Sequence, residues 1–200
     1  MSQPAATGPD FFALVTYTPE PLREWLLQLR RSLPVESSSE PHITILPPRP
    51  LMLPAPEAWQ KITSILNGWA PFEVELSEVQ VFPETNVLYL QVSDGYTILE
   101  DMHSTLNTGD FFHEETFSFH PHLTVGGPVP VQDLQQIHRK AIQAWEASGC
   151  PCRFKVEEFA FVCISTSEHG REWNRLWMHK LPGAKVQQRA AGTHTTNQTF

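Results

Sequence analysis

A five-residue pattern that occurs twice, 80 residues apart, constrains the fold of this chain more than any other feature. Residues 41–45 read PHITI and residues 121–125 read PHLTV. Both copies alternate polar and apolar residues behind a proline, which predicts a short β-strand in each. Because successive side chains of a strand point to opposite faces, each copy presents a His/Thr pair on one face and two aliphatic side chains on the other. The repeat therefore predicts two matched strands in two related halves.

The looser spelling His-x-Thr carries little information by itself. It also occurs at residues 103–105, inside an expected helix, and at residues 194–196, near the end of the chain. Neither of these has the strand alternation of the other two copies, so only His42 and His122 are singled out.

Hydrophobic periodicity predicts strands and helices that alternate along the chain. Strands are expected at residues 11–17, 41–46, 71–81, 86–92, 119–125, 153–164 and 172–181, and helices at 19–33, 58–69, 96–106 and 131–147. A Pro-rich connection is expected at 47–56, an irregularity within 153–164, and a helical turn is the alternative for 172–181. The order predicts an α+β fold with two pseudo-symmetric lobes, mostly antiparallel sheets flanked by helices, and a central groove.

The length of 200 residues suits one bilobal domain, expected at residues 10–182. Residues 1–9 read as a flexible leader without signal-peptide character, and 183–200 as a disordered polar tail. The odd set of cysteines, Cys150, Cys152 and Cys163, argues against a disulfide framework and matches no zinc pattern. A cytoplasmic monomer without a membrane span, a metal, a cofactor or an obligate protein partner is expected.

The formal net charge of -8 and the absence of a Lys/Arg-rich run argue against a general nucleic-acid-binding protein. Nonspecific affinity for nucleic acids comes from cationic contacts to phosphates, which this chain supplies sparingly. An RNA substrate would therefore be held by its terminus, or as a nucleotide, in a local cleft.

Two histidines on matched strands suit the cleavage of a phosphodiester. In-line displacement at phosphorus needs a base for the attacking oxygen and an acid for the leaving oxygen, and imidazole can be either near neutral pH. His42 and His122 are the candidates for these roles, which the sequence leaves unassigned between them. Thr44 and Thr124 share their faces and could donate hydrogen bonds to the phosphate oxygens. This chemistry requires no metal.

The paired motif resembles that of the 2H phosphoesterase superfamily, and the wider layout resembles its 2′-5′ RNA ligase / cyclic phosphodiesterase branch. The resemblance spans roughly residues 10 to 182 and includes the segments FFALV, HITI, VQVFP, NVLYLQV and FSFHPHLTV. It implies a bilobal fold whose central groove holds both motifs. It also implies hydrolysis of 2′,3′-cyclic phosphates at RNA ends or on nucleotides, reversible 2′-5′ RNA joining, and a catalytic set of His42, Thr44, His122 and Thr124.

Four further residues are candidates for substrate binding. Phe119 could stack on a base, and His120 stands where many members of the family carry a phosphate-contacting Arg. Arg49 could lean into the cleft from the Pro-rich connection, and Tyr89 lies on a strand that could border the groove.

Two other functions remain open from the sequence. The first is a catalytically silent module that binds an RNA end or a nucleotide. The second is a phosphodiesterase that acts on a small non-RNA cyclic phosphate, such as one derived from ADP-ribose.

Overall fold

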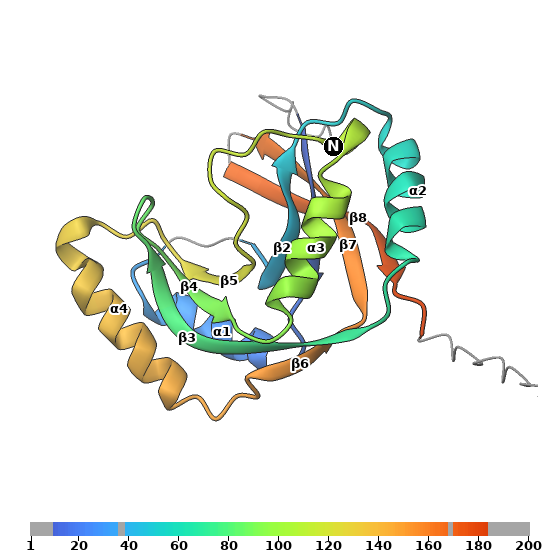
Figure 1. Ribbon diagram of the computed structural model, residues 1–200. Coiled ribbons are helices and arrows are strands. Elements are labelled where there is room, and N and C mark those ends of the chain that lie inside the picture. Colours follow the sequence, from blue (N-terminus) through green and yellow to red (C-terminus); the bar gives the residue numbers. More distant parts are fainter. Residues whose placement is uncertain (1–9, 36–38, 168–169, 184–200) are drawn as a thin grey trace, which may run out of the picture.

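The computed structural model describes residues 10–35, 39–167 and 170–183. In chain order the elements are β1 (Phe11–Tyr17), α1 (Leu22–Ser32), β2 (His42–Arg49), α2 (Ala55–Leu66), β3 (Phe72–Phe82), β4 (Val87–Val92), α3 (Tyr96–Leu106), η1 (Gly109–Phe111), β5 (His122–Gly126), α4 (Val131–Glu146), β6 (Arg153–Val156), β7 (Glu158–Ser167) and β8 (Gly170–Lys180). The fold is α+β, as predicted. The strands form one curled sheet with helices packed against it (Figure 1).

The sheet has an internal pseudo-twofold axis at its centre. The eight strands lie in the order β6-β3-β4-β5-β2-β1-β7-β8, and every neighbouring pair is antiparallel. β2 and β5, the two motif strands, are adjacent and pair through Ile43 and Leu123, which are equivalent positions of the repeat. Four strands lie on either side of this axis. The predicted pseudo-symmetric halves are thus two parts of one sheet that meet at the motif strands.

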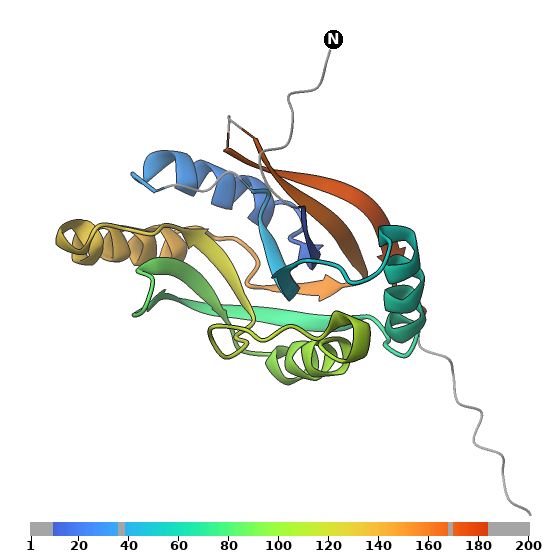
Figure 2. The ribbon, with the colours of Figure 1, turned by 90° about the horizontal axis from the view of Figure 1, so that it is seen from above.

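Two of the helices cross from one half of the sheet to the other. α1 follows β1 but contacts β5, and α3 follows β4 but contacts β2. α1 therefore lies beside α4 (Figure 2), and the ring centroids of Trp25 and Trp145 are 5.3 Å apart between them. On the other half, Trp59 of α2 stacks on Phe161 of β7 and Trp177 of β8. Each half of the sheet is thus covered by one helix from its own half and one from the other.

The two faces of the sheet carry different side chains because strand residues alternate. The large core cluster joins all four α-helices to one face and includes Leu14, Ile43 and Leu123, each 0% exposed. The opposite face carries the motif His/Thr pairs, and we call it the motif face. Its apolar floor is a small cluster of short side chains: Ala13, Val15, Ala160, Val162 and Ile164.

The structure differs from the sequence-based expectation at several boundaries. β2 continues through Pro47 and Pro48 to Arg49, because a bulge in its pairing with β1 accommodates residues that cannot donate to the ladder. β5 begins at His122 rather than at residue 119, and α2 begins at Ala55 because prolines are tolerated in a first helical turn.

The expected strand 153–164 is two strands that lie in different halves. β6 pairs with β3, β7 pairs with β1, and Glu157 separates them. The terminal segment that also fitted a helical turn is β8, which pairs with β7 along almost its whole length. The leader 1–9 and residues 184–200 of the expected tail lie outside the described residues. Within the described ranges, none of the helices combines the length and the apolar character that a bilayer crossing requires.

The pairing at the axis is predicted to be a main determinant of stability. Ile43→Ala removes a fully buried side chain between the halves of the sheet, so we expect the free energy of unfolding to fall by about 2–5 kcal/mol. Urea denaturation measures the loss. Met52→Ala, at a position 80% exposed, is the control and should stay within about 0.5 kcal/mol of the wild type. Equal stability of the two variants would contradict this role of the axis pair.

Candidate active site

The four motif side chains lie together at the centre of the sheet. Antiparallel pairing about the axis places His42 opposite Thr124 and Thr44 opposite His122. All four side chains are partly exposed, whereas the residues between them are buried. The ten residues from 41 and the ten from 121 follow the same burial pattern at every position. The two copies are therefore equivalent in their surroundings as well as in sequence.

Both motif imidazoles are oriented by the same backbone hydrogen bond. Nδ1 of His42 lies 2.6 Å from the carbonyl oxygen of Glu40, and Nδ1 of His122 lies 2.6 Å from that of His120. A carbonyl oxygen only accepts, so Nδ1 carries the proton and donates it in each ring. The neutral imidazole then has its lone pair on Nε2. Each ring is thus fixed in the tautomer that can take or give a proton through Nε2.

Burial keeps both imidazoles neutral near pH 7. It lowers the pKa of His122 to about 4, a shift that its backbone hydrogen bond only partly opposes and to which His120 and His42 add. Burial also lowers the pKa of His42, and the nearby charge of Arg30 contributes. The two rings project from neighbouring strands on the same face of the sheet, because Ile43 of β2 pairs with Leu123 of β5.

Arg30 of α1 contacts both β5 and the segment before β2 from the helix-covered side of the sheet. Its guanidinium donates to the carbonyl oxygens of Val125 at 3.1 Å, Thr124 at 2.6 Å and Ser39 at 2.7 Å. The side chain is buried, no acidic partner is found for it among the described residues, and burial lowers its pKa to about 10. Arg30 thereby joins β5 to the segment that leads into β2.

His103 of α3 makes the reciprocal contact across the axis. Its Nδ1 lies 2.8 Å from the carbonyl oxygen of Ile45, the position in β2 that corresponds to Val125 in β5. Each crossing helix therefore hydrogen-bonds the motif strand that belongs to the other half of the repeat. These contacts fix the relative position of the two His/Thr pairs.

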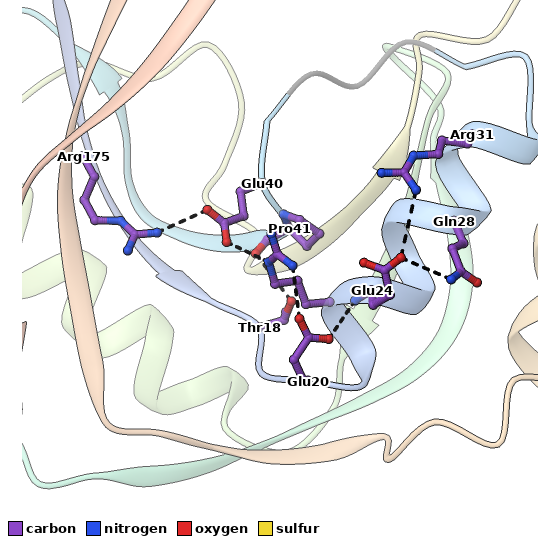
Figure 3. Close-up of polar contacts among 9 residues, drawn as sticks. Thr18, Glu20, Glu24, Gln28, Arg31, Glu40, Pro41 and Arg175 are labelled. Atoms are coloured by element: carbon purple, nitrogen blue, oxygen red, sulfur yellow. Dashed lines mark hydrogen bonds and ion pairs between the residues drawn. The ribbon is translucent and has the colours of Figure 1, made fainter.

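On the side of His42, aromatic and charged residues surround the ring. Trp173 of β8 lies 4.8 Å from it between ring centroids, and Tyr17 of β1 lies edge-on at 6.3 Å. Glu40 accepts hydrogen bonds from Arg23 at 2.8 Å and from Arg175 at 3.2 Å, as Figure 3 shows for the bond that reaches over from β8. The two cations balance the carboxylate, which stands two residues before the catalytic candidate.

On the side of His122, the corresponding space is filled with packed rings. Phe82 stacks on Tyr89 at 4.0 Å, and both rings meet His122 and His120 edge-on. The Nε2 atom of His120 is buried without a hydrogen-bond partner, and burial lowers the pKa of this ring. Tyr89, predicted to border the groove, lies opposite Thr124 on the motif face and is 8% exposed.

Two of the predicted binding residues contact other parts of the protein. Arg49 does not lean into the cleft: its guanidinium is buried and bonds Asn107, the carbonyl of Phe111 and Glu115. The ring of Phe119 stacks on His103 at 3.9 Å. The prediction for Arg49 is wrong because an Arg in a Pro-rich segment gives no sign of a carboxylate as distant in the sequence as Glu115.

Sequence reasoning did not find Tyr17, Trp173, Arg30 or His103 as parts of the site. Their positions depend on strand pairing and helix crossing, and no local pattern marks them. The repeat itself offered a partial signal for Glu40, since it stands at the same place in its copy as His120. In the part of the chain that the structure describes, no set of three or more His, Cys, Asp or Glu side chains is arranged to hold a metal ion.

The geometry agrees with the comparisons to known proteins. The model of the 2′-5′ RNA ligase superfamily matches residues 18–167, a segment that contains both motifs. The chain belongs to this superfamily. Two proteins similar to this chain carry the provisional name phosphoesterase. The one from Halalkalibacterium halodurans is 30% identical over 147 residues, 66% of this chain and 85% of that protein. The one from Staphylococcus haemolyticus is 27% identical over 123 residues, 61% and 69% of the two chains.

Solved structures share the fold. E. coli LigT complexed with 3′-AMP superposes with a TM-score of 0.60 at 15% identity, over 87% of this chain and 99% of LigT. A protein from Thermus thermophilus also gives 0.60, at 19% identity over 88% and 100% of the two chains. The family and its named relatives indicate an enzyme of the phosphoesterase type.

Replacing Arg30 should affect both stability and titration. Arg30→Met leaves three carbonyl oxygens without their donor, so we expect the free energy of unfolding to fall by about 3 kcal/mol or more. Loss of the nearby positive charge should also raise the pKa of His42, which NMR of the ring measures. Arg30→Lys keeps the charge and should shift the pKa less.

Arg31→Met is the matched control, because Arg31 is the next residue of α1 and its side chain is 72% exposed. This variant should leave both the stability and the titration of His42 unchanged. The same result for Arg30→Met would refute the positioning role of Arg30.

The lowered pKa of His122 predicts a pH-dependent stability. The unfolded chain binds a proton on this ring near pH ~6.5, whereas the folded protein does so only near its pKa of about 4. The stabilising contribution is complete above ~6.5 and is lost as the pH falls toward 4. His122→Gln should therefore reduce the fall in unfolding free energy between pH 7 and pH 4.5. An unchanged slope, or a His122 ring that titrates near ~6.5 in NMR, would contradict the assignment.

Proposed function

We propose that this protein hydrolyses 2′,3′-cyclic phosphates at RNA ends or on nucleotides by two-histidine general acid–base catalysis. The observation that carries the proposal is the matched geometry of His42 and His122, each held in the same tautomer by the carbonyl two residues before it. Family membership supports the class of reaction, and the occurrence of 3′-AMP and phosphate in complexes of E. coli LigT supports the class of ligand.

The reaction begins with the cyclic phosphate between the two Nε2 atoms. One imidazole takes a proton from water as its oxygen forms a bond to phosphorus. The other gives a proton to the ribose oxygen as its bond to phosphorus breaks. The rings therefore start in different protonation states, and binding of the anion favours the required proton on one of them because a negative charge raises a neighbouring pKa.

Thr44 and Thr124 serve the phosphate rather than the proton transfers. Each hydroxyl lies on the motif face opposite the histidine of the other copy. A hydroxyl donor directed at a non-bridging oxygen stabilises the charge that builds up in the transition state. The same groups can act when a 5′-hydroxyl takes the place of water: its oxygen forms the bond to phosphorus, the bond from phosphorus to the 3′-oxygen breaks, and a 2′-5′ RNA joint results. We also propose that the protein acts as a monomer in the cytoplasm and needs no metal or cofactor.

Substitution of the motif residues tests the proposal. His42→Ala and His122→Ala should each lower kcat for adenosine 2′,3′-cyclic phosphate about 10²–10⁴-fold, because each removes one proton-transfer group. Thr44→Val and Thr124→Val should each lower kcat about 10²-fold. Chromatography measures the rate of product formation. Adding EDTA should not change this rate in the wild type.

His113→Ala, a histidine in the loop before β5, is the control and should retain wild-type turnover. Full activity in either motif-histidine variant would exclude the paired mechanism. Tight binding of the cyclic nucleotide without any product in the wild type would instead favour the catalytically silent module.

A further inference from the structure

A pocket of about 390 Å³ opens on the motif face directly beside His42. Its volume falls within the range of small-molecule sites, about 300–1,000 Å³. The residues that line it come from β1, the segment before β2, and the start of β8: Tyr17, Ser39, Glu40, His42, Arg171, Glu172, Trp173 and Asn174. The mechanism above uses only the histidine, so the pocket needs an explanation of its own.

Two aromatic side chains form apolar walls of the pocket. Trp173 and Tyr17 both pack against the small floor cluster of the motif face. Ile164, the cross-strand partner of Trp173, supports the indole from that floor and is 4% exposed. The guanidinium of Arg175 covers the ring of Tyr17 at 4.4 Å. The indole is thus held in place at the pocket surface, where it can serve as a stacking platform.

The edge of the pocket offers groups that can recognise a base. The Glu40 carboxylate accepts one bond on each oxygen, from Arg23 and from Arg175. A carboxylate has about four acceptor positions, so it can still accept from an N–H group of a ligand. Asn174 adds a side-chain amide, whose NH₂ group can donate and whose oxygen can accept a hydrogen bond. The two arginines offset the charge of Glu40, which would otherwise repel a phosphate at His42.

Among the described residues, packed rings occupy the equivalent place in the other half of the repeat. Beside His122, the rings of Phe82, Tyr89 and His120 pack against each other and against the motif histidine. The pseudo-twofold symmetry is therefore broken: open space with polar edges borders His42, and packed rings border His122. A phosphate held between the histidines has room for a large substituent on one side.

We infer that the pocket beside His42 binds the base of a nucleoside, stacked on Trp173, while its cyclic phosphate lies between the two motif histidines. The inference rests on the proposed function and adds a base-binding site and an orientation of the substrate to it. The substrate then bears a nucleobase, and the base lies toward β8. A phosphodiester without a base would use the motif residues but not the pocket.

A comparison of two substrates tests the inference. Trp173→Ala should raise KM for adenosine 2′,3′-cyclic phosphate about 10-fold or more, the usual effect of losing one base–aromatic stack. Hydrolysis of methyl riboside 2′,3′-cyclic phosphate, which lacks a base, should be unchanged in both kcat and KM. Trp173→Phe should restore much of the loss. Leu176→Ala, at an exposed position of β8 that does not line the pocket, is the matched control and should match the wild type on both substrates.

The possible failures can be told apart. An equal effect of Trp173→Ala on both substrates, or no effect on the nucleotide, would overturn the pocket assignment while leaving the proposed function intact. If the wild type hydrolyses neither substrate, the proposed function fails, and calorimetry then decides the pocket by itself. Weaker binding of 3′-AMP, but not of ribose 3-phosphate, to Trp173→Ala would support it, and equal binding of 3′-AMP to both proteins would overturn it.

Discussion

The pairing of β2 with β5 about the Ile43–Leu123 contact is the constraint on which the rest of the molecule depends. It joins two four-stranded halves into one sheet, and it does so at the residues that carry the chemistry. Because the repeat pairs with itself in antiparallel orientation, each histidine faces the threonine of the other copy. The crossing of α1 and α3 strengthens this junction, since Arg30 and His103 each hold a carbonyl of the opposite motif strand.

The two halves of the site are alike at the motif residues and differ in what surrounds each histidine. The symmetric part of the site supplies two equivalent imidazoles with equivalent backbone partners, which suits an in-line reaction that needs one acid and one base. The proposed reaction of a nucleotide is not symmetric, however, because one side of the phosphate carries a nucleoside and the other does not. The two sides of the site differ in the same way: a pocket lies at Trp173, and packed rings lie at Phe82 and Tyr89.

Elements with strong local periodicity were predicted accurately, and elements defined by their partners were not. The strand Phe11–Tyr17 and the helix Tyr96–Leu106 agree with expectation at both ends, because each has its own apolar pattern. The run from 153 to 164 is predicted as one strand with an irregularity, and the structure breaks it at Glu157, since nothing in its sequence shows that its two parts pair in opposite halves. Pro47 and Pro48 were read as a connection because their place in a bulge is visible only once β1 lies beside them.

The sequence by itself determined the alternation of helices and strands and the repeated His/Thr pairs that place four polar groups on one face. Alternation in a strand is a local property, so it follows from residue order alone. Only the tertiary structure decided that the two motif strands are neighbours, that buried Arg30 ties them together, and that Trp173, 131 residues after His42, stands beside its ring. These contacts join segments far apart in the chain, so they depend on which strands pair and on how the helices cross the sheet, and residue order does not show either locally.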